Sequence, residues 1–211
     1  GDADGMVTGI TRRFPECYAD VKRVVDMQPD KVPIGYSIVV ARHGTVFLAD
    51  TSINETPSAE QLATIAKQMV RNARTMGHHP RVAFLSFSNF GSREIERIDR
   101  IRKAIRILDA EGVDFEYDGE MQADMALDYE LLKSTYPFAR LTGSANVLIM
   151  PGLHSAHISS RLMQSLGGVT VIGPVIDGLA KPMQVVQMGA TVSDLVNHAA
   201  LAAYGALSRK R

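Results

Sequence analysis

The sequence is poor in several features that would mark particular classes of protein. Its 211 residues include one cysteine, Cys17, and no tryptophan, and basic and acidic side chains balance at 23 each. A single cysteine excludes an internal disulfide framework, and zero net charge gives no overall field to attract nucleic acid or an anionic membrane. No stretch approaches the roughly 20 apolar residues of a membrane span. We therefore predict a cytoplasmic protein with neither nucleic acid nor membrane as a partner.

What the sequence does contain is typical of a globular protein. Hydrophobic residues make up 45% of the chain and charged residues 22%, which is enough for a sizeable core. The chain has no initiator methionine and no leader peptide. We therefore expect Gly1 to be a cut end or a tag remnant, and the chain to be a fragment.

Strand-like and helix-like patterns alternate along the chain. Two β-rich runs flank His43-Gly44 and predict a hairpin. Expected strands cover 34–42, 45–50, 81–87, 113–117, 146–150 and 169–173, and expected helices 57–76, 91–112, 121–134, 154–166 and 192–207. This alternation predicts an α/β fold with a mainly parallel sheet. The segment 29–33, with a proline at each end, is the best candidate for a linker.

Familiar catalytic signatures are absent. There is no G-x-G-x-x-G, no phosphate-binding loop ending in Lys-Ser/Thr, no H-E-x-x-H and no G-x-S-x-G. The loop 86–92 leaves a strand and enters a helix, where backbone N–H groups can hold an anion. Because any such turn needs small polar residues, we favour a structural role for it.

Two other clusters have ordinary explanations, and a third stays open. His154 and His157 lie three residues apart, but no further metal ligand is near them in the sequence, so we expect no metal site. We interpret the carboxylates of 118–124 as turn and first-turn residues of a helix. The run 1–9 combines two carboxylates with glycines, and alone it leaves open a calcium-like loop, an active-site turn or a frayed terminus.

Asp194 stands three residues after Thr191, near the start of the last expected helix. Thr-x-x-Asp fits a capping box, in which the hydroxyl and the carboxylate each accept a backbone N–H. Such a carboxylate stabilises a helix by about 0.5–1 kcal/mol. Asp194 therefore needs no catalytic role to explain it.

Five segments in order along the chain together resemble the phosphate acetyltransferase family. These are residues 3–9, 48–54, 81–88, 118–124 and 173–182. Finer features at 115–121, 141–147 and 154–157 resemble the branch of this family that is fused to the C-terminal end of bacterial NADP-dependent malic enzymes. The chain is thus identified as a phosphate acetyltransferase-like domain of that branch.

The resemblance implies a three-layer α/β/α fold of the isocitrate/isopropylmalate dehydrogenase type. Residues 1–211 would form one phosphate acetyltransferase-like domain, with 21–168 as a complete lobe and 1–20 and 169–211 as segments of another. The ligand site would lie in the cleft between lobes. Apolar surface meant for the missing part would be exposed or used for self-association, so we expect a homo-oligomer, at least a dimer.

The resemblance also implies which residues to inspect. Asp194 matches the family's general base, whereas Gln187 and Met188 stand where a serine and an arginine bind the phosphoryl and carbonyl oxygens. A cysteine of some active members is replaced by Thr11. We therefore expect no catalytic residue. The expected ligand-binding residues are Asp4, Gly5, Thr8, His154, Ser155, Gln187 and Asp194.

The leading hypothesis is an inactive regulatory and oligomerisation module that binds acetyl-CoA as an allosteric effector. The parent enzyme would convert malate oxidatively to pyruvate, using NADP and Mg or Mn held by domains outside this sequence. The fragment itself would carry no cofactor. Two alternatives stay open: an active phosphate acetyltransferase, favoured by Asp194, and a purely structural oligomerisation domain with an empty cleft.

Overall fold

The computed structural model describes residues 2–92 and 96–208. Its main element is a six-stranded sheet in the order β5-β4-β6-β3-β2-β7. The neighbours from β5 to β3 run parallel, while β2 pairs antiparallel with both β3 and β7. The strands are β2 (Ile34–Ala41), β3 (Gly44–Ala49), β4 (Arg81–Leu85), β5 (Glu116–Met121), β6 (Val147–Ile149) and β7 (Thr170–Asp177).

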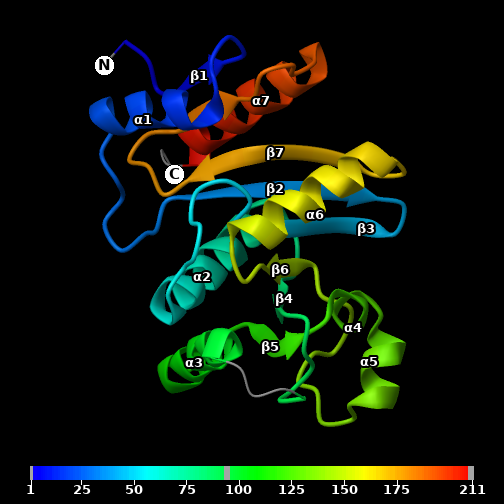
Figure 1. Cartoon of the computed structure of the whole chain (residues 1–211). Helices are drawn as coiled ribbons and strands as arrows, with labels where there is room; N and C mark the ends of the chain where they lie inside the picture. The colour runs from blue at the N-terminus through cyan, green and yellow to red at the C-terminus, as the bar shows by residue number, and fades with distance from the viewer. Residues whose placement is uncertain (1, 93–95, 209–211) are drawn as a thin grey trace.

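Helices cover both faces of this sheet, which gives the α/β fold with a mainly parallel sheet that the sequence predicts (Figure 1). Successive strand residues point to opposite faces, so Phe47 joins the core under one set of helices and Leu48 the core under the other. The first set is α2 (Ala59–Thr75) and α3 (Glu96–Glu111); the second is α4 (Ala123–Leu127), α5 (Tyr129–Thr135) and α6 (Leu153–Leu166).

The two ends of the chain meet in a smaller unit. Here β1 (Met6–Gly9) pairs parallel with β8 (Met183–Val186), and α1 (Phe14–Val24) and α7 (Val192–Ser208) lie beside them. Figure 1 shows β1, α1 and α7 gathered at one end of the molecule, beyond β7. A separate core cluster joins side chains of α1 to residues 176–185. The sequence pattern does not predict β1, α1 or β8, because each is short or only partly apolar.

The hairpin and most helices are confirmed. Helix α2 is confirmed, but it starts at Ala59 and not at Pro57. Ser58 caps it: the Ser58 hydroxyl oxygen accepts the Gln61 backbone N–H at 3.2 Å, and the Gln61 side-chain oxygen accepts the Ser58 N–H at 2.8 Å. The start expected for α3, at 91, falls partly on residues outside the described part of the chain. None of the described helices is long and apolar enough to cross a membrane. The division into lobes at 20 and 168 stays a prediction. Strand β7, from the expected segment 169–211, pairs with β2 of the expected lobe 21–168.

The strand expected at 113–117 is wrong in its position. The structure places β5 at Glu116–Met121, so Asp118 and Glu120 lie in a strand and not in a turn. Gly119 pairs with Phe84 of β4 and has φ of 144°, and a Cβ there would lie 2.8 Å from the Phe84 carbonyl oxygen. The glycine that suggested a turn is needed instead for close strand approach.

Two further boundaries differ from the prediction. The helix expected over 121–134 is divided into α4 and α5, because Asp128 caps the second helix by accepting the Leu131 backbone N–H at 3.0 Å. The strand expected to stop at Gly173 continues as β7 through Pro174 to Asp177. The β2–β7 pairing shifts register between Tyr36 and Ile38, and such an irregularity admits a proline within a sheet.

Candidate functional site

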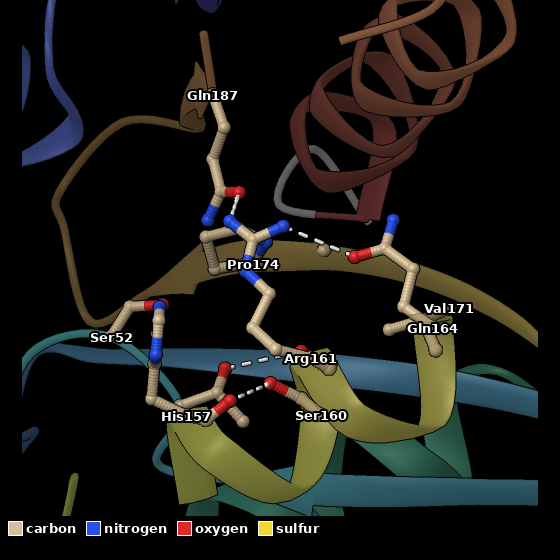
Figure 2. A pocket seen from close by; sticks show the side chains of 11 residues that line it. Ser52, His157, Ser160, Arg161, Gln164, Val171, Pro174 and Gln187 are labelled. Atoms are coloured by element: carbon tan, nitrogen blue, oxygen red, sulfur yellow. Dashed lines mark hydrogen bonds between the residues drawn. The ribbon is translucent and has the colours of Figure 1, made fainter. Parts of the chain in front are cut away.

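A small polar pocket lies where α6, β7, β2 and the loops after β3 and β8 come together (Figure 2). Its volume of about 20 Å³ has room for about one water molecule. The lining residues are Ser37, Thr51, Ser52, His157, Ser160, Arg161, Gln164, Val171, Gly173, Pro174 and Gln187. A larger ligand therefore requires side chains at its mouth to move.

The base of the pocket is fixed by the loop after β3. The buried Asp50 carboxylate accepts backbone N–H groups of Gly35, Ser52, Ile53 and Asn54 at 2.8–3.1 Å. Thr51 donates its hydroxyl to the Gly35 carbonyl at 2.8 Å, and its oxygen lies 3.1 Å from that of Ser37. These bonds hold the loop against β2, so the wall formed by Thr51 and Ser52 is rigid.

The opposite wall is one face of α6. His157, Arg161 and Gln164 are spaced at i, i+4 and i+7, which places them on one side of a helix. The Arg161 guanidinium donates from Nη1 to Gln164 Oε1 at 3.1 Å and from Nη2 to Gln187 Oε1. Figure 2 shows Arg161 extending between these two glutamines. Arg161 thus connects α6 to the residue that follows β8.

The structure brings only one of the expected ligand residues into this pocket, Gln187. His154 is exposed in the first turn of α6, and Ser155 donates its hydroxyl to the Gly152 carbonyl at 2.8 Å. Neither lines the pocket. Met188, next along the chain from Gln187, is 59% exposed.

Asp194 forms the capping box that the sequence predicts. Its Oδ2 accepts the Thr191 backbone N–H and the Thr191 hydroxyl, each at 2.8 Å, and its own N–H lies 3.2 Å from the Thr191 oxygen. The carboxylate is not among the residues that line the pocket. In this structure its contacts are those of a helix cap.

The expected N-terminal ligands lie in other hollows. Asp4 and Gly5 face the C-terminal part of α7 in a shallow, mostly apolar depression. Thr8 lies on β1 in a hollow shared with Thr11 and Arg12. Residues 6–9 form a strand, so this part of the N-terminal run is neither a loop nor frayed.

The loop 86–92, considered as an anion site, already holds an anion of the protein itself. Glu120 is 1% exposed, and its Oε1 accepts the Gly91 N–H at 2.9 Å and the Ser88 hydroxyl at 3.1 Å. Arg102 donates to both oxygens, at 2.9 and 3.1 Å. Burial alone would raise the pKa of Glu120, but Arg102 and Gly91 outweigh it, so the pKa lies below its ordinary value. The loop 86–92 therefore has the structural role that the sequence analysis favours.

Sequence reasoning missed Arg161, Gln164 and Ser52. The helical spacing of Arg161 and Gln164 from His157 could have indicated these two residues. From the sequence we paired His157 only with His154, in the preceding turn. Ser52 lies in the segment 48–54, one of the five that resemble the family, but the resemblance assigned it no role. Within residues 2–92 and 96–208, no group of three or more His, Cys, Asp or Glu side chains is placed to hold a metal ion.

Comparison with known families places this chain in a defined class. Residues 1–203 match the family model described as phosphate acetyl/butaryl transferase, and the chain belongs to that family. A phosphotransacetylase from Streptococcus pyogenes has the same fold, with a TM-score of 0.90 at 30% identity over 98% of this chain and 64% of that one. EutD phosphotransacetylase from Staphylococcus aureus matches with a TM-score of 0.85 at 28% identity.

Among curated relatives, the NADP-dependent malic enzyme of Rhizobium meliloti is 52% identical over 98% of this chain and 27% of its own length. The NADP-dependent malic enzyme of Escherichia coli is 38% identical, over 96% of this chain and likewise 27% of its length. The chain thus spans about a quarter of these relatives. A phosphate acetyltransferase of Clostridium acetobutylicum is 31% identical over 95% of this chain and 63% of its length. The resemblance inferred from the sequence is confirmed.

Proposed function

We infer that this chain is a phosphate acetyltransferase-like regulatory module that binds acetyl-CoA without transferring the acetyl group. It acts as part of a cytoplasmic NADP-dependent malic enzyme, whose other domains oxidise malate to pyruvate with NADP and Mg or Mn. The similarity to malic enzymes over nearly the whole chain supports this setting. Acetyl-CoA serves as an allosteric effector in this proposal.

The observation that carries the proposal is the loop after β8. By the resemblance, Gln187 and Met188 occupy the positions of the serine and arginine that bind phosphoryl and carbonyl oxygens. Met188 is 59% exposed, and a thioether has neither charge nor hydrogen-bond donor. Losing one such stabilising donor costs about 100-fold or more in rate. The chain therefore keeps the transferase scaffold while lacking its phosphate clamp.

The retained Asp194 does not offset this loss. Its carboxylate is engaged by Thr191 in the helix cap, which accounts for an acid at this position. Its position in the family nevertheless favours a second candidate function, an active phosphate acetyltransferase. The 31% identity to the Clostridium acetobutylicum enzyme supports that alternative.

Self-association is the second part of the proposal. Ile158, Leu162 and Leu166 recur every four residues on α6 and are 62%, 56% and 77% exposed. A continuous apolar stripe of this kind is typical of a contact surface. It supports a homo-oligomer, at least a dimer, in which α6 contributes to the contact.

Acetyl-CoA binding is tested by thermal unfolding of the full-length polypeptide that contains this chain. At about 100 times its dissociation constant, a ligand stabilises the folded state by about 2.7 kcal/mol. We expect a raised melting temperature and a changed rate of malate-dependent NADP reduction. No shift at saturating acetyl-CoA would contradict the proposal, and formation of acetyl phosphate would favour the alternative.

A further inference from the structure

The polar pocket at α6 has an uncompensated positive charge. Of the residues that line it, Arg161 is a permanent cation and His157 is ionisable, and none is an aspartate or glutamate. Within the described part of the chain, no ion pair joins Arg161 to a carboxylate. A guanidinium in a concave site without a counter-ion favours an anionic ligand, above all phosphate, whose oxygens match its fork of N–H groups.

The guanidinium is oriented by neutral groups. Gln164 and Gln187 each supply an amide oxygen to it, from α6 and from the loop after β8. Such acceptors fix the plane of the guanidinium without neutralising its charge. The amide nitrogens of the two glutamines make no hydrogen bond with the described residues, so they remain donors beside Arg161.

The facing wall supplies a further donor. The hydroxyl of Ser52 makes no hydrogen bond with the described residues and lines the same pocket. The hydroxyls of Ser160 and Thr51 already donate, to the carbonyls of His157 at 3.0 Å and of Gly35 at 2.8 Å. Figure 2 shows Ser52 on the side of the pocket opposite Gln164, with Arg161 between them.

We propose that Arg161 is the phosphoryl-binding group of this cleft, with Gln187 as the placeholder that holds it in position until the anion arrives. The pocket of about 20 Å³ is too small for a phosphate while Arg161 contacts Gln187. The anion replaces the Gln187 oxygen on the guanidinium, and the Ser52 hydroxyl completes its binding. Gln187 thus has a role of its own at the position of the family's serine. Arg161 of α6 supplies the positive charge that Met188, at the position of the family's arginine, lacks.

This inference deepens the proposed function, on which it rests for the identity of the ligand as a phosphorylated acyl thioester. Its test therefore uses two probes, acetyl-CoA and inorganic phosphate, titrated by calorimetry into the purified protein. The variants are Arg161→Gln, which removes the charge, and Arg161→Lys, which keeps the charge without the fork. Arg106→Gln is the matched control, because Arg106 is exposed on α3 and forms no ion pair with the described residues.

We expect Arg161→Gln to weaken acetyl-CoA binding about 10-fold or more and to abolish competition by phosphate, with Arg161→Lys between it and wild type. Arg106→Gln should match wild type. Equal acetyl-CoA affinity in wild type and Arg161→Gln would overturn the role of Arg161 and leave the proposed function intact. Arg161-dependent phosphate binding without acetyl-CoA binding would do the reverse, and binding of neither probe would overturn both.

Discussion

Replacing Glu120 by glutamine tests how the loop 86–92 is held, with almost no change in side-chain shape. Among the described residues, the side-chain carboxylate accepts from the Gly91 N–H, the Ser88 hydroxyl and the Arg102 guanidinium, which are all donors. An amide keeps one oxygen, but its NH₂ must face a donor. The variant therefore loses at least one bond to Arg102 and removes the buried carboxylate charge from that ion pair, while the contact of Arg102 with Asp99 at 3.5 Å remains.

The expected cost follows from the burial of the pair. Glu120 has 1% of its side chain exposed and Arg102 25%. Breaking a buried ion pair by removing one partner costs about 3–5 kcal/mol. Because Arg102 retains some access to water and its ion pair with Asp99, we expect the low end of this range, about 3 kcal/mol, at neutral pH. For a chain of this size that corresponds to a fall in melting temperature of about 6–12 °C.

Urea unfolding of wild type and Glu120→Gln measures this difference through the midpoint and the slope. Glu55→Gln is the control, because Glu55 is exposed and its side chain makes no hydrogen bond with the described residues. The lowered pKa of Glu120 also sets the direction in which the stability difference changes with pH. Its stabilisation is present above the unfolded pKa, about 4.3, and is lost as pH falls through the folded value, so the two proteins should converge in acid. A difference below about 0.5 kcal/mol at pH 7 would refute the reasoning.

Burial alone would raise the pKa of Asp177, but Lys31, the Gly178 N–H and Asn72 together outweigh it, so the pKa lies below its ordinary value. Asp177→Asn should therefore cost about 2 kcal/mol at pH 7, a difference that disappears below about pH 4; urea unfolding at several pH values that shows a constant difference would contradict this. Thr191→Ala removes the cap of α7 and should cost about 1 kcal/mol in unfolding free energy, whereas an unchanged melting temperature would mean that the cap is unimportant. The double variant Gln187→Ser with Met188→Arg should bind inorganic phosphate more tightly in calorimetry, and an unchanged affinity would show that the loop is not placed as the resemblance implies.

Much of the fold follows from the sequence, because its periodicities are strong. Two β-rich runs around Gly44 predict the hairpin, and an apolar stripe at helical spacing predicts α2. The two errors in strand position have a common cause. Gly119 and Gly173 resemble ends of elements, but each lies within a strand where the neighbouring backbone approaches too closely for a side chain. Local sequence does not contain that tertiary requirement.

The sequence predicts less of the candidate site than of the fold. The capping role of Asp194 is local and was predicted correctly. The pocket, in contrast, joins residues 37, 52, 161 and 187, which are far apart along the chain. Only the arrangement of β2, β7 and α6 brings them together, so no spacing in the sequence indicates that Arg161 contacts Gln187.

The central claim is that the scaffold binds acetyl-CoA but does not transfer its acetyl group. The most direct test is the rate of acetyl phosphate formation from acetyl-CoA and phosphate by protein already shown to bind acetyl-CoA. We predict no formation above the background without protein, and none in Asp194→Asn. Formation above background in wild type that is lost in Asp194→Asn would contradict the account and identify the chain as a working transferase.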